Sequence, residues 1–397
     1  MNAVGPDLRQ RVLELAQGRY ARVNDQHVTE LLAEREGIHL SRSTVRRILR
    51  TAGLPSPRKR RAPKHRQRRE RAPQEGLLVQ IDGSPHDWLE GRGPRLTLLL
   101  AVDDATGKVL AALFRPQEDA HGYFLVLRRI VQTLGRPVAL YHDRHSIFER
   151  SPKASETLEE QLTGKREPTQ FGRLVAELGI RSIPARSPQA KGRVERCGGT
   201  FQDRLVVELR LAGACTLAEA NHVLEAFLPH FNARFAVPAA AADLAYRPLD
   251  PGVDPETLFC FKYLRTVAAD NTVRLGEHRL QLLPSRERAS YARARVEVQE
   301  RLDGSVAVYY QGRCVATKPA PPEAPVLRAR PGRAQAKAAA PKPRNPSSAA
   351  GQAVAVGSVE MWADQRAVHL STPRPRPDHP WRNAYKQHGD RIAEPLR

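Results

Sequence analysis

The stretch Leu77-Leu-Val-Gln-Ile-Asp-Gly83 decides which fold this chain can adopt. Its apolar composition and the glycines at 76 and 83 predict a short central strand. A strand buried on both faces has no structural use for a carboxylate, because burying an unpaired charge is strongly unfavourable. We therefore expect Asp82 to lie at the end of this strand, where it faces a cleft or a metal ion.

Two further carboxylates occur in comparable settings. Asp143 ends the apolar run 138–143, and Glu195 lies in Ser187-Pro-Gln-Ala-Lys-Gly-Arg-Val-Glu195. Taken singly, each acid is more simply a turn former, a cap or a solvated helix residue. Together they suit Mg²⁺, which prefers oxygen ligands and can promote an in-line displacement at phosphorus when two ions act as a pair. We predict that Asp82, Asp143 and Glu195 hold two Mg²⁺ or Mn²⁺ ions and form the catalytic site.

The charge balance of the chain points to a polyanionic partner. Its 397 residues carry a formal net charge of +21, which is extreme for a metabolic enzyme and typical of proteins that bind nucleic acid. A membrane surface would attract the same charge, but no apolar run approaches the roughly 20 residues that span a bilayer, and no signal peptide opens the chain. The four cysteines form no CxxC pair and suggest no disulfide scaffold, so we expect a cytoplasmic protein.

The first 56 residues predict a helix-turn-helix domain. Helices are expected over 7–17, over 25–36 with Asp25 as the N-cap, and over 41–53 with Ser41 as the N-cap. The last helix carries apolar residues on one face and basic residues on the other, as expected of a helix that enters the major groove. A plain helical bundle with a solvated arginine face is the alternative. The DNA contacts predicted on this helix are Arg42, Ser43, Arg46, Arg47 and Arg50.

A basic linker is expected over residues 57–75. Between Arg58 and Arg71 it holds nine Lys or Arg and a single acid, a density of like charge that cannot pack into a core. If these charges neutralise phosphates, affinity for DNA should fall steeply with salt. A nuclear-localisation signal would fit the same composition, but nothing else in the chain supports a eukaryotic address. The DNA contacts predicted here are Lys59, Arg60 and Arg61.

Residues 76–248 predict a ribonuclease H-like α/β core. Strands over 95–104 and 107–114 form a hairpin after the first strand, with Asp103 and Asp104 as turn formers rather than metal ligands. Three antiparallel strands followed by a helix and a parallel strand describe this mixed sheet with flanking helices. The later elements expected are a helix over 118–134, a strand over 138–142, a polar insertion over 150–169, a short helix over 170–178, a short strand over 180–183, and helices over 189–211 and 217–231.

The helix that carries Glu195 has unusual neighbours. Lys191 and Gln202 share its face, where they would suit contacts to phosphate or sugar. Three glycines at 192, 198 and 199 each cost a helix roughly 1 kcal/mol, which makes sense if a nucleic-acid backbone passes close by. His142 and His145 beside the second acid raise the alternative of a zinc site, but no matching Cys or His pair occurs elsewhere. We expect both histidines to face water or DNA.

Beyond the core the pattern changes twice. Residues 255–317 alternate apolar with polar side chains and contain turn signals such as Asp303-Gly304, which predicts a small β-barrel of about five strands. From 318 to 397, Pro, Ala, Arg and Gly dominate, and we assign no fold to this low-complexity basic tail. The expected class is therefore multidomain α/β.

Three motifs give the chain a family resemblance. They are Gln80-Ile-Asp-Gly-Ser-Pro-His-Asp-Trp88, Tyr141-His-Asp-Arg-His-Ser-Ile-Phe148 and Ser187-Pro-Gln-Ala-Lys-Gly-Arg-Val-Glu-Arg196. With them the chain resembles the DDE-type transposases of bacterial insertion sequences that have a retroviral-integrase-like core, and it looks most similar to the ISNCY group. The interval between the second and third acids is longer than is common among relatives. The N-terminus looks short beside that of many relatives, and from this resemblance we expect a truncated copy.

This resemblance implies a function and its partners. It assigns the acid triad to Asp82, Asp143 and Glu195, with divalent metal, for DNA strand cleavage and strand transfer without a covalent protein–DNA intermediate. The partners implied are double-stranded DNA at the element ends and target, and further copies of the chain in a homodimer or higher oligomer on the bacterial nucleoid. Two alternatives stay open: a catalytically inactive, domesticated sequence-specific DNA-binding protein, and a ribonuclease H-like nuclease that acts on hybrids or junctions.

Overall fold

The computed structural model describes residues 4–55, 69–150, 158–164, 166–185 and 191–321. The chain divides into two units after Ala324, and the second unit lies outside the described residues. The predicted tail is therefore described only as far as residue 321. Most of the predicted linker, including Lys59, Arg60 and Arg61, also lies outside the described part.

The N-terminal part consists of three helices, α1 (Pro6–Gln17), α2 (Asp25–Glu36) and α3 (Arg42–Thr51), whose apolar faces meet in one buried cluster. Ser41 caps α3 as predicted, because its Oγ accepts the Thr44 N–H at 3.2 Å. The predicted cap of α2 is wrong by one residue. Asn24, rather than Asp25, accepts the His27 N–H at 2.9 Å, which leaves the Asp25 carboxylate available to α3.

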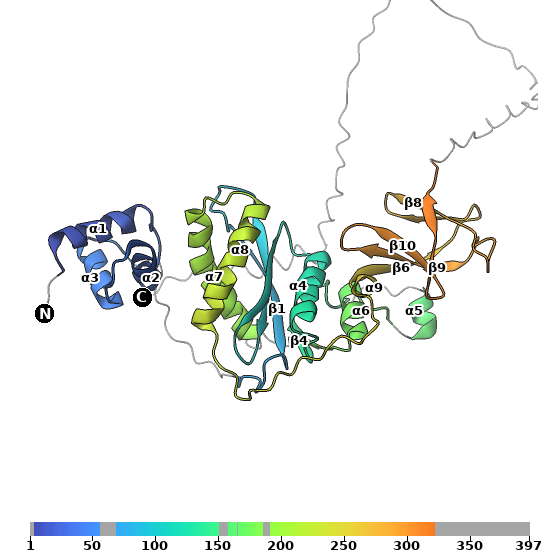
Figure 1. Ribbon diagram of the computed structural model, residues 1–397, viewed down its shortest axis with the longest axis horizontal. Helices are drawn as coiled ribbons and strands as arrows, with labels where there is room; N and C mark the ends of the chain where they lie inside the picture. Colours follow the sequence, from blue (N-terminus) through green and yellow to red (C-terminus); the bar gives the residue numbers. More distant parts are fainter. Residues whose placement is uncertain (1–3, 56–68, 151–157, 165, 186–190, 322–397) are drawn as a thin grey trace, which may run out of the picture. The chain divides into compact units, whose positions relative to one another are not determined.

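A five-stranded mixed sheet in the order β3-β2-β1-β4-β5 forms the centre of the chain (Figure 1). Its strands are β1 (Val79–His86), β2 (Leu96–Asp103), β3 (Val109–Arg115), β4 (Ala139–His142) and β5 (Arg181–Pro184). The first three strands are antiparallel, and β4 and β5 run parallel to β1. The predicted hairpin and parallel strand are confirmed, and the chain has the mixed α/β architecture that the sequence indicated.

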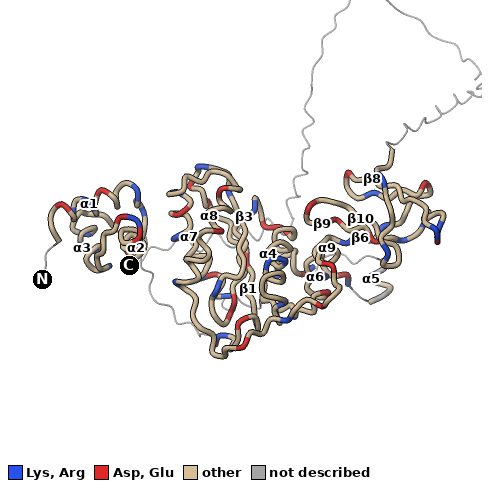
Figure 2. Tube along the Cα trace, viewed as in Figure 1, with Lys and Arg blue, Asp and Glu red and all other residues tan. Residues whose placement is uncertain are grey.

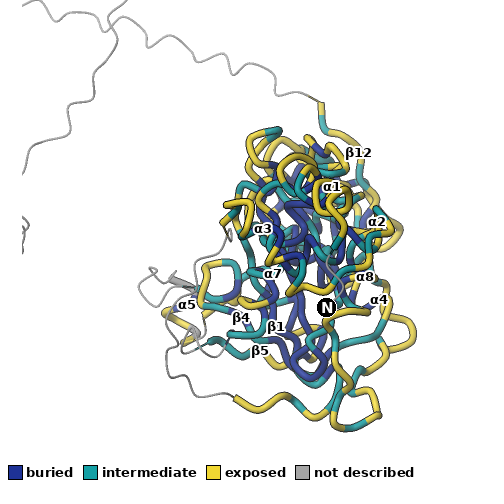
Figure 3. The backbone as a smooth tube through the Cα atoms, turned by 90° about the vertical axis from the view of Figure 1, so that its left-hand side faces the viewer, coloured by how far each residue is buried: buried dark blue, intermediate teal, exposed yellow. Residues whose placement is uncertain are grey.

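Helices cover both faces of this sheet (Figure 1). They are α4 (Ala120–Thr133) and α6 (Gln170–Glu177) on one face, and α7 (Gly192–Leu211) and α8 (Leu217–Phe235) on the other. Alternate residues of β2 divide between the two cores, with Leu99 and Ala101 on the α4 side and Leu98 and Leu100 on the α7 side. Figure 3 shows buried backbone beside the β1 label, and the first three residues of β1 are buried. Burial on both faces explains why β2 and β3 are nearly continuous apolar runs.

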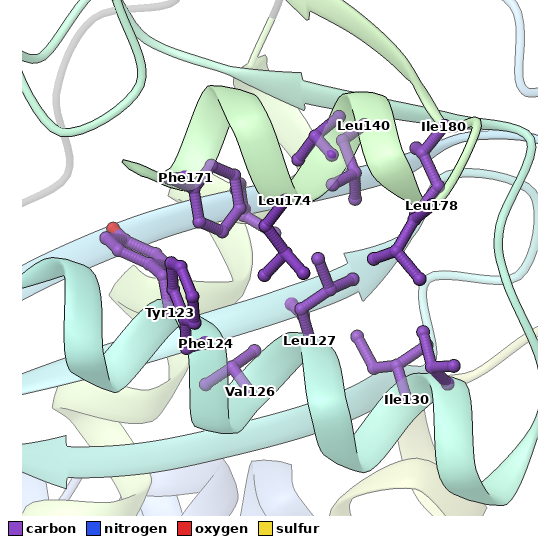
Figure 4. Close-up of a cluster of buried hydrophobic side chains, with 14 of the residues drawn as sticks. Tyr123, Phe124, Val126, Leu127, Ile130, Leu140, Phe171, Leu174, Leu178 and Ile180 are labelled. Atoms are coloured by element: carbon purple, nitrogen blue, oxygen red, sulfur yellow. The ribbon is translucent and has the colours of Figure 1, made fainter. Parts of the chain in front are cut away.

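The core on the α4 side is aromatic and tightly interleaved. Figure 4 shows Phe124 and Leu127 of α4 meeting Phe171 and Leu174 of α6 beside Leu140 of β4. The rings of Phe124 and Phe171 pack edge to face with centroids 6.2 Å apart. A further helix, α5 (Leu158–Thr163), lies within the stretch 150–169 that we predicted as a polar insertion.

Two asparagines of α8 cover the free edge of the sheet. β3 is an edge strand, so one side of its backbone lacks a neighbouring strand. Asn221 accepts the Phe114 N–H at 2.8 Å and donates to the Phe114 carbonyl at 3.2 Å. Asn232 does the same for Val109 at 2.8 and 2.9 Å. The predicted end of this helix at 231 is wrong, because α8 continues to Phe235. Asn232 therefore lies within the helix, from which its amide reaches β3.

The two acids at the end of β2 have different roles. Asp103 shapes the hairpin turn as predicted, accepting the Thr106 N–H and hydroxyl, each at 2.8 Å. Asp104 was predicted to do the same, but its carboxyl group turns inward instead and accepts hydrogen bonds from distant segments, including Gln80 at 2.6 Å. The doubled acid therefore combines one turn former with one buried acceptor.

The later strands form two small sheets after α9 (Pro255–Leu258), in the orders β11-β10-β9-β6 and β12-β8-β7, around a shared apolar cluster. Their bounds are β6 (Cys260–Thr266), β7 (Thr272–Leu275), β8 (His278–Leu282), β9 (Arg295–Arg301), β10 (Val306–Tyr310), β11 (Arg313–Val315) and β12 (Thr317–Pro319). The all-β character agrees with the prediction. The predicted number of about five strands is too low, because β11 and β12 have three residues each and are too short to show an alternating pattern.

Charged residues are spread along the described chain rather than gathered in one block (Figure 2). Figure 2 shows Lys and Arg interleaved with Asp and Glu in the N-terminal helices, the central sheet region and the later strands alike. None of the helices in the described ranges has both the length and the apolar character needed to cross a membrane.

Replacing Asn221 or Asn232 by alanine should lower the free energy of unfolding by about 1–3 kcal/mol, because each change leaves two backbone groups of the edge strand without a protein partner. Chemical denaturation measures the effect. His222→Ala is the control, since His222 is exposed on the same helix. Losses no larger than those of the control would contradict the role given to the asparagines.

Candidate active site

The predicted acids Asp82 and Asp143 come together on neighbouring strands. β1 and β4 pair in parallel up to Gln80 and Tyr141. Two residues further along each chain segment stand Asp82 and Asp143, so the register of the sheet brings the two carboxylates side by side. This convergence was predicted from sequence.

The prediction that Asp82 ends its strand is wrong. Asp82 lies in the middle of β1. β1 continues to His86 and pairs with β2 throughout, with Asp82 opposite Leu100. The other side of Asp82 is open because β4 stops at His142. The sheet therefore exposes a mid-strand carboxylate by ending the adjacent strand early.

The ammonium group of Lys191 joins the two acids. Its Nζ lies 2.7 Å from Asp82 Oδ1 and 3.6 Å from Asp143 Oδ2, and its side chain is only 7% exposed. Burial raises the pKa of the Asp82 carboxyl, Lys191 opposes this rise, and the charge of Asp143 adds to it. Adjacent carboxylates repel unless a positive charge lies between them. Lys191 supplies that charge, whereas the sequence had suggested a contact to phosphate or sugar for it.

The two histidines beside Asp143 have different surroundings. His142 is 1% exposed, and its Nε2 lies 2.7 Å from the Ser182 hydroxyl of β5. Burial lowers the pKa of His142. The expectation that His142 faces water or DNA is therefore wrong, because its ring links β4 to β5. His145 is exposed, and its backbone N–H donates to Asp143 Oδ1 at 2.9 Å, which helps to orient that carboxylate.

The third predicted acid, Glu195, is not brought into this pair. It lies exposed in the first turn of α7, four residues and about one helical turn after Lys191. Within the described ranges, no group of three His, Cys, Asp or Glu side chains is placed to hold a metal ion. The segment 186–190, which leads into α7, lies outside those ranges. The structure thus assembles two of the three predicted ligands.

The residues that are assembled fit a hard divalent cation. Asp82 and Asp143 offer oxygen donors, the ligand type that Mg²⁺ prefers, and they already share one positive charge from Lys191. The Lys191 ammonium thus occupies the place between the two carboxylates where a metal cation could bind. A divalent ion bound by these oxygens would take over the role of Lys191.

A fourth acid, Glu118, lies against the same strand and was missed in the sequence. A Cβ added at Gly83 would fall 2.6 Å from the Glu118 carboxylate carbon, so a larger residue here would require the Glu118 side chain to shift. Tyr123 donates its hydroxyl proton to Glu118 at 2.6 Å. Burial raises the pKa of Tyr123 well above its usual value, and the charges of Glu118, Asp82 and Asp143 add to the rise, so the phenol remains a donor. The available signal was the glycine directly after Asp82.

The predicted DNA contacts of α3 separate into two groups. Arg42, Ser43, Arg46 and Arg47 are exposed, as expected for residues that meet a ligand. Arg50 was predicted to face outward with them, but its guanidinium bonds both carboxylate oxygens of Asp25 at 2.8 Å. It also donates to the Leu54 carbonyl at 2.6 Å. Arg50 therefore fastens α3 to α2.

The α7 residues expected near nucleic acid also face the protein in part. Gln202 donates to the Ser84 hydroxyl of β1 at 3.0 Å. Gly198 is buried, and a Cβ there would lie 3.7 Å from the Leu100 side chain, so the idea of a passing nucleic-acid backbone does not apply to it. At Gly192 and Gly199 an added Cβ would meet no described heavy atom within 4 Å.

Comparison with known proteins finds relatives over much of this chain. It is 36% identical over 312 residues to a putative transposase, y4bF, of Sinorhizobium fredii. The alignment covers 78% of this chain and 66% of that relative. This chain is a relative of insertion-sequence transposases. It is also 35% identical over 269 residues to the transposase for insertion sequence IS1202 of Streptococcus pneumoniae, which covers 59% of this chain and 56% of that protein. The chain thus spans about two thirds of the first relative and just over half of the second.

No protein-family model matches this chain. Solved structures align with it more weakly than the two transposases do. A chain of the simian T-cell lymphotropic virus intasome in complex with PP2A regulatory subunit B56 gamma aligns with 79% of this chain and 100% of its own length, at 14% identity and a TM-score of 0.32. The HTLV-2 integrase catalytic core domain in complex with magnesium aligns with 38% of this chain and 84% of its own length, at 17% identity and a TM-score of 0.27. Similarity at this level carries no argument about the site.

Lys191→Met should destabilise the metal-free protein, because it leaves Asp82 and Asp143 facing each other without a positive charge. We expect a loss of about 1–3 kcal/mol at pH 7 and a larger stabilisation by Mg²⁺ than in the wild type. Thermal unfolding with EDTA and with Mg²⁺ measures both effects. Lys191→Arg keeps the charge and should lose less. Unfolding curves of the methionine variant that match the wild type would show that Lys191 does not neutralise the pair.

Proposed function

We propose that this chain is the DNA transposase of an insertion sequence, which binds terminal inverted repeats and catalyses metal-dependent strand cleavage and strand transfer. The observation that carries the proposal is the convergence of Asp82 and Asp143 on one cation, in a chain 36% identical to a putative transposase. Grouped carboxylate oxygens are the ligands that metal-dependent phosphoryl transfer uses. The order of the central strands supports assigning them to the ribonuclease H-like class.

In this proposal the site is completed by Glu195. Asp82, Asp143 and Glu195 would hold two Mg²⁺ or Mn²⁺ ions, which would supply activation of the attacking hydroxyl and stabilisation of the leaving oxygen. The residues of the chain itself do the remaining work. Lys191 offsets part of the negative charge of the two aspartates, and its ammonium would be available to a DNA phosphate if those carboxylates bound metal ions. Tyr123 holds the Glu118 carboxylate against Gly83 through its hydroxyl.

Recognition of DNA is assigned to the N-terminal helices and the linker. We propose that α2, the turn at Gly37 and α3 act as a helix-turn-helix, with α3 in the major groove. Arg50 supports this reading indirectly, because its bonds to Asp25 and Leu54 fix α3 against α2. The side chains proposed to contact DNA are Arg42, Ser43, Arg46, Arg47, Lys59, Arg60, Arg61, Lys191 and Gln202, the last two after release from their present partners.

The proposed reaction also sets the assembly and the location. Two element ends must be held together with target DNA, so we propose a homodimer or higher oligomer on double-stranded DNA, at the nucleoid of a bacterial cell. The β-rich part from β6 to β12, which we propose forms a small barrel, and the basic tail are assigned to contacts with DNA or with a second copy. Their net positive composition would favour contacts with phosphate over contacts with a basic protein surface.

Asp82→Asn, Asp143→Asn and Glu195→Gln should each reduce cleavage and strand transfer of repeat-end DNA by about 10³-fold, because each removes a charged oxygen that the transition state needs. Binding of the same DNA should stay near the wild-type level. The control is Asp87→Asn, which alters a carboxylate that accepts only a local bond from Gly91 N–H at 3.1 Å among the contacts described for it.

The outcomes of that assay separate the candidate functions. Full activity in any one of the three variants would remove that acid from the site. A wild-type protein that binds the repeats tightly but never cuts them would favour the inactive DNA-binding alternative. Cleavage without preference for the element's own ends would favour a ribonuclease H-like nuclease.

Arg46→Ala and Arg47→Ala should weaken binding of repeat-end DNA. Each lost phosphate contact should also reduce the slope of log affinity against log salt by about 0.9. Fluorescence anisotropy over a range of salt concentrations measures both quantities. Arg9→Ala, an exposed arginine on α1, is the control and should leave affinity and slope unchanged. Variants of α3 that bind like the wild type would rule out this helix as the recognition element.

A further inference from the structure

Asp104 is a buried acid that accepts hydrogen bonds from three separate segments of the chain. Its side chain is 0% exposed. From the end of the linker it accepts the Ala72 N–H at 2.8 Å and a bond from Arg69. From β1 it accepts the Gln80 amide at 2.6 Å, and from α7 the Arg193 guanidinium at 2.7 Å. Asp104 is not one of the proposed metal ligands, and a turn would require none of these distant donors.

Gln80 extends this network to the backbone of α7. The side chain of Gln80 is buried, and its Oε1 accepts the Val194 N–H at 3.2 Å. The first N–H groups of a helix have no partner within the helix. Lys191 stands at the N-cap position of α7 and makes no capping bond with its side chain. Gln80, held by Asp104, therefore does for α7 what a capping residue would otherwise do.

The geometry of β1 connects this network to the acid pair. Val79 and Ile81 point into the core on the α4 side, so Gln80 and Asp82 point to the opposite face, which α7 covers. Gln80 meets the start of α7 at Val194, and Asp82 meets it at Lys191. Two positions on one strand thus fix both the placement of the helix and the charge pairing.

The end of the linker is fastened at the same place. Arg193 donates through its second terminal nitrogen to the Arg69 carbonyl at 2.9 Å. Arg71 donates to the Ala105 carbonyl at 2.9 Å, one residue after Asp104. The segment that leads from the N-terminal helices and the first turn of α7 therefore share one buried acceptor.

We propose that Asp104 is a positioning residue that couples the end of the basic linker to the start of α7, and so sets where Lys191 and Glu195 lie relative to Asp82. Asp104 acts through Gln80 and Arg193 and does not touch the reacting atoms. The coupling itself is a property of the folded chain. Its consequence for catalysis rests on the proposed function.

Hydrogen exchange tests the coupling without requiring activity. In Asp104→Asn and in Arg193→Gln, the amides of residues 192–198 should exchange about tenfold faster than in the wild type, because one bond that holds the helix start is lost. Arg193→Gln leaves Asp104 its other donors, so it keeps the test informative if the first variant fails to fold. Asp103→Asn is the matched control: Asp103 is equally buried but accepts from Gly76 and Thr106.

Exchange at 192–198 that is unchanged in both variants, or equally fast in Asp103→Asn, overturns the proposal. The second readout is strand transfer on repeat-end DNA, where Asp104→Asn should lower kcat and leave KM for DNA unchanged. An unchanged kcat despite faster exchange overturns the positioning role. A wild type that shows no DNA cleavage overturns the proposed function instead, and the exchange data then decide the coupling alone.

Discussion

The positive charge of Lys191 between Asp82 and Asp143 is the interaction on which the rest of the site depends. A parallel strand pair places two carboxylates side by side, and such an arrangement is unfavourable unless a cation is present. The sheet alone would therefore be unstable at this point. By reaching back from the start of α7, Lys191 makes the arrangement tolerable and brings the helix that carries Glu195 to the edge of the same site.

The buried side chains of Gln80 and His142 near this site form hydrogen bonds that connect separate elements of the fold. Gln80 is buried between Val79 and Ile81 of β1, where an unbonded amide would be costly. It joins Asp104 to the backbone of α7, so its polarity serves the placement of a helix. His142 likewise links β4 to β5. The polar interior thus orders the elements whose ends carry the acids.

Sequence reasoning located the strands, the parallel pairing and the convergence of Asp82 with Asp143, because apolar runs and their order carry that information. It could not place Lys191, Gln80 or Asp104. Each of these side chains finds its partner on a segment far along the chain, and no local pattern records such a distance. The same limit applied to Arg50, whose helical face suggested solvent although its guanidinium reaches Asp25 on α2.

The amides of Asn221 and Asn232 have a consequence for self-assembly. An uncovered edge strand offers a ladder of backbone groups to any other extended peptide, including the same strand of a sister molecule. Here a single helix conceals that ladder at Phe114 and Val109. Local melting of α8 would uncover backbone donors and acceptors of β3 that can pair with another extended peptide, so the docked helix protects the chain from unwanted strand pairing.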